Sequence, residues 1–284
     1  MIAFDDASAR FTTFLKQQGK ATATILAYRN DIAQLAAYLT DRGLTVVSSV
    51  TLELLDQFKA DLASQNYTAK SISRKINSFK TFFKYLKAEG IIDVDPAVGV
   101  SHPRYTVKPP RILSKTEYRA LRDACHSDIR TYAIVEMLLQ TGMRIGEVAN
   151  LQMEDLKNNE LFVRPFESHN SRYIPLNKAA KAALDAYLKI RPNAKDKSVF
   201  ITKTGKPFLI RNIRSTIERY FEIAEIKESK VNDLRHTWIY HHLASGTPLI
   251  VISKLAGHKR VSTTEKYLDL INARGDSRVK LEEL

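Results

Sequence analysis

The chain has 284 residues, 44% of them hydrophobic, which is enough to build the cores of two ordinary domains. Its 44 Lys and Arg against 31 Asp and Glu give a net charge of +13, which favours a polyanionic partner such as nucleic acid over a basic enzyme that binds none. A single cysteine, Cys125, excludes an internal disulfide framework. The absence of a long apolar run and of a signal-peptide pattern predicts a cytoplasmic protein that does not enter membranes.

Four segments in the first third of the chain repeat apolar residues at helical spacing. They cover residues 5–19, 24–39, 52–62 and 69–88. We therefore expect a four-helix domain over residues 1–90.

The fourth of these helices also has a basic face. No acidic residue interrupts the run of Lys70, Arg74, Lys75, Lys80, Lys84 and Lys87. Such a face is either simply solvated or laid along a DNA backbone, with each cation near a phosphate. We take these cations as candidate DNA contacts.

Residues 91–113 break the helical pattern and contain four prolines, Pro96, Pro103, Pro109 and Pro110. Prolines favour extended chain, so this segment is expected to be an interdomain linker. Arg104 and Lys108 lie in it and are further candidate DNA contacts. A helical domain joined in this way to a second domain could close around a duplex.

The second domain is expected to span residues 114–284 and to be mainly helical. A capping-box pattern at Ser114–Glu117 begins it, and helices are expected to residue 125 and over 129–140, 178–190 and 211–225. Residues 161–164 and 171–174 predict a β-hairpin, and 198–201 a third strand. The predicted fold class is mainly α with a small antiparallel sheet.

Four residues in this domain suggest chemistry on a phosphate. Arg144 and Arg235 lie near the starts of predicted helices, where a guanidinium fork and the helix dipole both favour an anion. His258 follows another helix and can donate a hydrogen bond. Tyr267 follows the capping-box pattern Ser262–Glu265 and can act as a nucleophile, with nearby cations favouring its ionised form.

Each of these residues also has an ordinary interpretation. Arg144 and Arg235 could form salt bridges with Glu147 and Asp233, and Tyr267 could be a helix residue with a solvated hydroxyl. The neighbouring histidines, His236, His241 and His242, are expected to be structural or exposed.

Taken together, four short motifs resemble the tyrosine recombinase or phage-integrase family, and its Xer-type members in particular. They are TGMRIGEVANL around Arg144, DLRHT around Arg235, LAGH at His258 and STTEKY at Tyr267. The resemblance implies an N-terminal core-binding domain and a C-terminal catalytic domain acting on double-stranded DNA at a specific site.

The resemblance also implies residue roles. Tyr267 would form a 3′-phosphotyrosyl link and release a 5′-hydroxyl, while Arg144 and Arg235 hold the scissile phosphate. His258 would bond a non-bridging oxygen and Glu147 would brace the pocket. No metal or ATP is implied, because the phosphotyrosine conserves the bond energy.

Two positions depart from the family pattern. Asn232 stands where a histidine is usual, and an amide cannot act as a base near neutral pH. Glu167 aligns with a catalytic lysine of the hairpin and would repel a phosphate. Other residues that could take the lysine's place are Lys157, Arg164, His169 and Arg172, the last also a candidate DNA contact.

These departures favour one alternative to a recombinase, a catalytically weakened DNA-binding or architectural protein of the same fold. A second alternative, which shares the arginines and the tyrosine, is a topoisomerase-like enzyme that nicks and reseals DNA. The segment 268–284 is more apolar than a free tail needs. As the resemblance implies, it would dock on a neighbouring protomer, giving a tetramer on two duplexes from a chain that is monomeric in solution.

Overall fold

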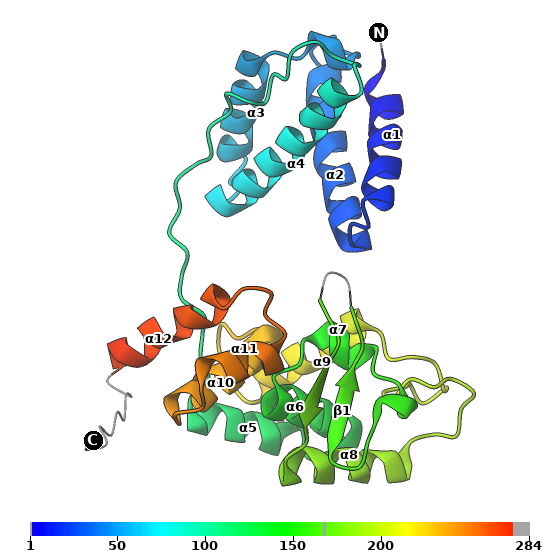
Figure 1. The fold of residues 1–284 in the computed structure, drawn as a ribbon, viewed down its shortest axis with the longest axis vertical. Coiled ribbons are helices and arrows are strands. Elements are labelled where there is room, and N and C mark those ends of the chain that lie inside the picture. Colours follow the sequence, from blue (N-terminus) through cyan, green and yellow to red (C-terminus); the bar gives the residue numbers. More distant parts are fainter. Residues whose placement is uncertain (1, 167–168, 275–284) are drawn as a thin grey trace. The chain divides into compact units, whose positions relative to one another are not determined.

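The computed structural model describes residues 2–166 and 169–274 (Figure 1). The chain divides into two compact units, residues 1–108 and 109–284, and the division falls inside the predicted linker. Within the described residues the fold is mainly helical with one two-stranded antiparallel sheet, as the sequence predicts. None of the described helices is long and apolar enough to cross a membrane.

The first unit is the predicted four-helix domain. Its helices are α1 (Phe4–Gln17), α2 (Thr22–Thr40), α3 (Leu52–Ser64) and α4 (Ala69–Ala88), with the short 3₁₀ turn η1 (Val47–Ser49) before α3. Buried aromatic rings, including those of Phe11, Phe58 and Phe83, fill the core between them. Ile92 and Val100 also lie in this core, so the chain packs against the first unit well beyond α4.

The face of α4 that the sequence marks as basic is partly used inside the unit. Asp31 of α2 is 1% exposed and accepts hydrogen bonds from Arg74 (2.5 and 2.9 Å), Lys75 (3.0 Å) and Ser78 (2.7 Å). A buried carboxylate needs such partners, because an unpaired one loses its hydration without compensation. The prediction that Lys75 lies on an exposed basic face is therefore wrong. Arg74 remains exposed beside its ion pair.

The second unit contains the remaining elements. Its first half is α5 (Lys115–Cys125), α6 (Ile129–Thr141), α7 (Ile145–Ala149), the 3₁₀ turn η2 (Met153–Asp155), β1 (Glu160–Val163) and β2 (Arg172–Pro175). Its second half is α8 (Lys178–Ile190), α9 (Ile210–Ile223), α10 (Val231–Ala244), α11 (Leu249–Ala256) and α12 (Ser262–Arg274). Figure 1 shows α10, α11 and α12 grouped together, and β2 of the hairpin contacts α11.

The hairpin pairs Leu161 with Ile174 and Val163 with Arg172. The predicted third strand at 198–201 is wrong. Within the described residues this segment makes isolated bridges, Gln152 to Ser198 and Ile201 to Pro207, because its two ends bond to different loops.

Two apolar clusters hold the second unit together. The larger surrounds α6, whose residues from Ala133 to Leu139 are buried throughout. The smaller joins α10, α11 and α12 through Trp238, Ile252, Tyr267 and Ile271. The helix that carries Tyr267 is thus anchored by the ring of Tyr267 itself.

Replacing Asp31 by Ala should destabilise the first unit by about 3–5 kcal/mol, because Lys75 would remain buried without its counterion. Hydrogen exchange of the full chain, followed by mass spectrometry, tests this. Peptides from α2 and α4 should exchange faster, while those from α6 and α10 should not change. Asp41→Ala, at an exposed position at the end of α2, is the control. Unchanged exchange in α2 and α4 of Asp31→Ala would contradict this account.

Candidate active site

The turn between α6 and α7 places the first arginine of the site. Gly142 ends α6 with φ of 62°, and a Cβ at this position would lie 2.2 Å from Cε3 of Trp238. Only glycine suits both the backbone and this close approach. The chain then reverses, and Arg144 becomes the residue that precedes α7.

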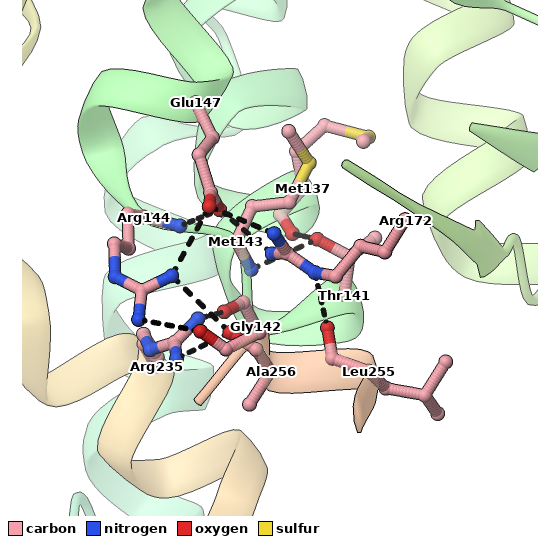
Figure 2. A network of polar contacts seen from close by, with 11 residues as sticks. Met137, Thr141, Gly142, Met143, Arg144, Glu147, Arg172, Arg235, Leu255 and Ala256 are labelled. Carbon is pink, nitrogen blue, oxygen red and sulfur yellow. Dashed lines mark hydrogen bonds and ion pairs between the residues drawn. The ribbon is translucent and has the colours of Figure 1, made fainter. Parts of the chain in front are cut away.

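Glu147, one turn into α7, connects Arg144 to Arg172 of the hairpin (Figure 2). Its carboxylate accepts the backbone N–H of Arg144 at 2.8 Å and the Arg144 Nη1 at 3.1 Å. Nη1 and Nη2 of Arg172 each donate to one carboxylate oxygen at 2.8 Å. The Glu147 side chain has no exposed surface, so this carboxylate is a fixed internal anchor.

The end of α11 supplies the other acceptors, since the last carbonyls of a helix have no partner within it. Arg172 Nε donates to the carbonyl of Leu255 at 2.6 Å. Arg144 donates to Ala256 and Gly257, each at 3.2 Å. Arg235 of α10 donates to Ala256 at 2.6 Å and, with its other terminal nitrogen, to Gly142 (Figure 2). Three arginines from three elements therefore meet at one helix end.

This arrangement leaves positive charge in excess, because three guanidinium groups surround the one carboxylate of Glu147. Burial alone would raise the pKa of Glu147, but hydrogen bonds and charge from Arg172 and Arg144 lower it to about 2. Burial and the neighbouring Arg144 lower the pKa of Arg235 to about 9. A bound anion would offset this repulsion, so the site suits a phosphate.

His258 lies directly after the glycine that ends α11. Its Nδ1 is 2.7 Å from Oγ1 of Thr264, a fully buried residue of α12. Burial and the charges of Arg235 and Arg144 lower the pKa of His258 to about 3, so the ring is neutral at physiological pH. When the Thr264 hydroxyl donates to Nδ1, the ring proton is on Nε2 and available to a ligand.

Tyr267 is 4% exposed, and its hydroxyl lies 2.5 Å from Nδ1 of His236. The Nε2 atom of His236 lies 2.7 Å from the amide nitrogen of Asn232. Burial raises the pKa of Tyr267 to about 12 in spite of the opposing charge of Arg235. The charge of Arg235 thus favours the ionised form, as the sequence predicts, but burial has the larger effect on this pKa.

Family models match most of both units. The model described as the phage integrase family matches residues 111–274, and the phage integrase N-terminal SAM-like domain matches residues 9–90. The chain belongs to the phage integrase family.

Known proteins similar to the chain agree with this assignment. Tyrosine recombinase XerC of Oceanobacillus iheyensis is 29% identical over 90% of this chain and 89% of the relative. Tyrosine recombinase XerD of Staphylococcus aureus is 30% identical over 88% of this chain and 89% of the relative. A lambda integrase tetramer bound to a Holliday junction has the same fold, with a TM-score of 0.76 at 17% identity over 92% of this chain and 79% of that one. The chain is thus an enzyme of the tyrosine recombinase class.

The salt bridges considered as ordinary alternatives are only partly present. Arg144 does pair with Glu147. Arg235 instead donates to backbone carbonyls, while Asp233 accepts the backbone N–H of Lys230 at 2.8 Å and caps α10. Within the described residues, Arg235 is thus buried with backbone carbonyls and no carboxylate as its hydrogen-bond acceptors, so its charge is available to an anion.

The residues that could replace the family's hairpin lysine differ in the contacts that they make. Arg172 is buried on Glu147 and so positions the anchor instead of lying free for DNA. Arg164 pairs with Asp155 at 2.8 Å and also with Glu154. His169 lies close enough to Arg144 and Glu147 for both charges to affect its pKa, which burial, the larger effect, lowers. Glu167 lies outside the described residues.

Sequence reasoning missed His236 as part of the site. It was grouped with His241 and His242 because all three lie close together on one helix. The signal that could have separated it is its spacing: four residues after Asn232, one helical turn away on the same face.

The stability of the second unit should depend on the ionisation of Glu147. Because its pKa falls from 4.5 to about 2 on folding, the carboxylate stabilises the unit above pH 4.5, and this is lost as pH falls towards 2. The contribution is about 3 kcal/mol. Urea unfolding followed by fluorescence of Trp238, the single tryptophan, measures it.

Glu147→Gln should be less stable than the unchanged chain at neutral pH, and the difference should shrink below pH 4.5. Glu218→Gln, at an exposed position on α9, should show no such difference. A Glu147→Gln difference that stays constant down to acid pH would contradict the assigned pKa.

Proposed function

We propose that this recombinase cuts and rejoins double-stranded DNA at a specific site through a covalent bond between Tyr267 and a 3′-phosphate. The observation that supports this most strongly is the meeting of Arg144 and Arg235 at the end of α11, directly before His258, while Tyr267 packs with residues of α10 and α11. Family membership supplies the reaction class, and these contacts support the choice of residues.

Arg144 and Arg235 would hold the scissile phosphate. Arginine binds phosphate oxygens through parallel hydrogen bonds and stays charged, which stabilises the charge that develops in a five-coordinate transition state. Glu147 and Arg172 do not need to touch DNA in this proposal. They fix Arg144 through a buried ion pair whose geometry is already set.

His258 would donate from Nε2 to a non-bridging oxygen. Its contact with Thr264 supports this, because a hydroxyl that donates to Nδ1 leaves the proton of the neutral ring on Nε2. A neutral donor adds no further cation to a site that already contains three arginines.

The chemistry is balanced within the DNA and the protein. Tyr267 Oη attacks phosphorus, the bond from phosphorus to the 5′-oxygen breaks, and that oxygen leaves as a hydroxyl. In the second step a 5′-hydroxyl attacks the phosphotyrosine and releases the tyrosine. The bond energy is conserved between the two steps, so neither ATP nor a metal ion is required.

DNA contacts outside the site would come from cations that remain accessible. Lys70, Lys84, Arg104 and Lys108 are exposed, Lys80 is partly exposed and Arg74 is exposed beside Asp31. The single cysteine, buried Cys125, agrees with action on DNA in the cytoplasm.

The chemistry can be tested with a substrate selected for the protein itself. Tyr267→Phe, which should bind without cutting, is used to select duplexes from a random library. Nicked versions of the selected duplex are then incubated with the unchanged chain. A covalent adduct that survives denaturation should form with the unchanged chain and not with Tyr267→Phe.

Arg144→Ala should reduce the rate of adduct formation by about 10²-fold or more, because one phosphate donor is lost. Arg219→Ala, at an exposed position on α9, should not change the rate. Tight binding with no adduct from the unchanged chain would instead favour an architectural DNA-binding protein. An adduct that persists in Tyr267→Phe would mean another nucleophile.

We further propose a tetramer on two duplexes. The lambda integrase tetramer on a Holliday junction supports this through its shared fold. The tail expected to join protomers lies, for residues 275–284, outside the described residues. Sedimentation should show a monomer without DNA and four protomers on paired duplexes, and deleting 275–284 should abolish the tetramer while leaving binding to one duplex. An unchanged tetramer after the deletion would contradict the role of the tail.

A further inference from the structure

The proposed nucleophile has a chemical problem in this structure. The pKa of Tyr267 is raised to about 12, so at neutral pH only about one hydroxyl in 10⁵ is ionised. Attack on phosphorus needs the phenolate or a base that takes the proton during attack. Asn232, at the position where the family pattern has a histidine, cannot supply this base.

The structure offers another histidine for that task. His236 lies one turn along α10 from Asn232, and its Nδ1 is 2.5 Å from the Tyr267 hydroxyl, which is hydrogen-bonding distance for direct proton transfer. The two rings also pack together, with centroids 5.9 Å apart. The contact joins α10 to α12 within the cluster that anchors Tyr267.

We propose that His236 is the general base of the cleavage step and that Asn232 selects its tautomer. This rests on the proposed function, in which Tyr267 is the nucleophile. During attack, the Tyr267 proton moves to Nδ1 of His236 as the bond from oxygen to phosphorus forms. The leaving 5′-oxygen takes its proton from water, which leaves hydroxide. In rejoining, the attacking 5′-hydroxyl gives its proton to hydroxide, and the imidazolium returns its proton to the departing tyrosine oxygen.

Asn232 matters because a neutral histidine accepts a proton through only one of its nitrogens. In the structure the amide presents its nitrogen to Nε2, and in this state the ring proton is on Nδ1 and the base is blocked. If the amide turns over and presents its oxygen, Nε2–H donates to it and Nδ1 is free to accept from Tyr267. The two ends of an amide occupy the same space, so the exposed Asn232 side chain can make this turn.

The charges around the pair agree with a base that is ready at neutral pH. Burial and the adjacent Arg235 lower the pKa of His236 to about 4, so the ring is neutral and able to accept. The charged groups that act on the pair are Arg235 and Asp233, both on α10; from α12 the group that faces His236 is Tyr267 itself. A bound phosphodiester would offset part of the charge of Arg235 and so raise the basicity of His236, while burial keeps the ring neutral at the working pH.

The test compares rates of adduct formation on the selected nicked duplex across pH. The unchanged chain should cleave at a nearly constant rate between about pH 6 and 8, because His236 remains neutral. His236→Gln should be slower by about 10²–10⁴-fold near pH 7, and its rate should rise about tenfold per pH unit as hydroxide replaces the base. Its affinity for the duplex should not change. His241→Gln, at an exposed position on the same helix, is the matched control.

A second variant tests the tautomer. Asn232→Asp offers only acceptor oxygens to Nε2, so it fixes the competent tautomer and raises the basicity of His236. The rate of adduct formation by this variant should therefore fall as the pH falls, with a midpoint nearer the ordinary pKa of imidazole, about 6.5. The same shift should be absent when Asn232→Asp is combined with His236→Gln.

Two results would overturn the inference while leaving the proposed function in place. One is cleavage by His236→Gln at the rate and pH dependence of the unchanged chain. The other is slower cleavage with an unaltered pH dependence, which would make His236 a positioning residue. If the unchanged chain forms no adduct at all, the proposed function itself fails and the inference falls with it.

Discussion

The ion pair between Glu147 and Arg172 is the interaction on which the site depends. A carboxylate with no exposed surface is costly unless its charge is matched, and Arg172 matches it with two parallel hydrogen bonds. Because the same carboxylate holds the backbone and side chain of Arg144, the start of α7, the hairpin and the end of α11 are fixed together. The guanidinium that would meet DNA is thereby positioned before any DNA binds.

The end of α11 explains why the arginines converge there. Helix termini leave carbonyl oxygens without partners, and they carry the negative end of the helix dipole. Leu255, Ala256 and Gly257 offer such carbonyls to Arg172, Arg144 and Arg235. Gly257 is needed at this point, because it has φ of 66° and a Cβ there would lie 2.8 Å from Arg172 Nη1. The short motif LAGH, residues 255–258, thus ends α11 and also supplies the carbonyl oxygens that hold the three arginines together.

Sequence patterns predicted most of the fold, since helical periodicity reports which face of each segment is buried. The bounds of α4 and α8 match the expected ones. The strand expected at 198–201 is absent from the described sheet, because buried apolar residues in an irregular loop have the same composition as a short strand. Charge was harder to interpret. Lys75 belongs to a basic run in the sequence, but only the packing of α4 on α2 shows that Asp31 buries it.

The site was predicted as a set of residue types and not as a set of contacts. Motifs indicated Arg144, Arg235, His258 and Tyr267, yet no local pattern reveals that Arg172 reaches Glu147 across 25 positions. The spacing of His236 from Asn232 places the two on one face of α10, but its contact with Tyr267 of α12 is not visible in any local pattern. The departure at Asn232, which suggested a weakened enzyme, is in the structure the neighbour of a second histidine in contact with the nucleophile.

Peptide mapping of the covalent adduct tests the central claim most directly. After nuclease trimming and proteolysis, mass spectrometry should find a nucleotide attached through its 3′-phosphate to Tyr267, and end-labelling should find a free 5′-hydroxyl on the released strand. Attachment to any other residue, or a 5′-phosphate on the released strand, would contradict the account.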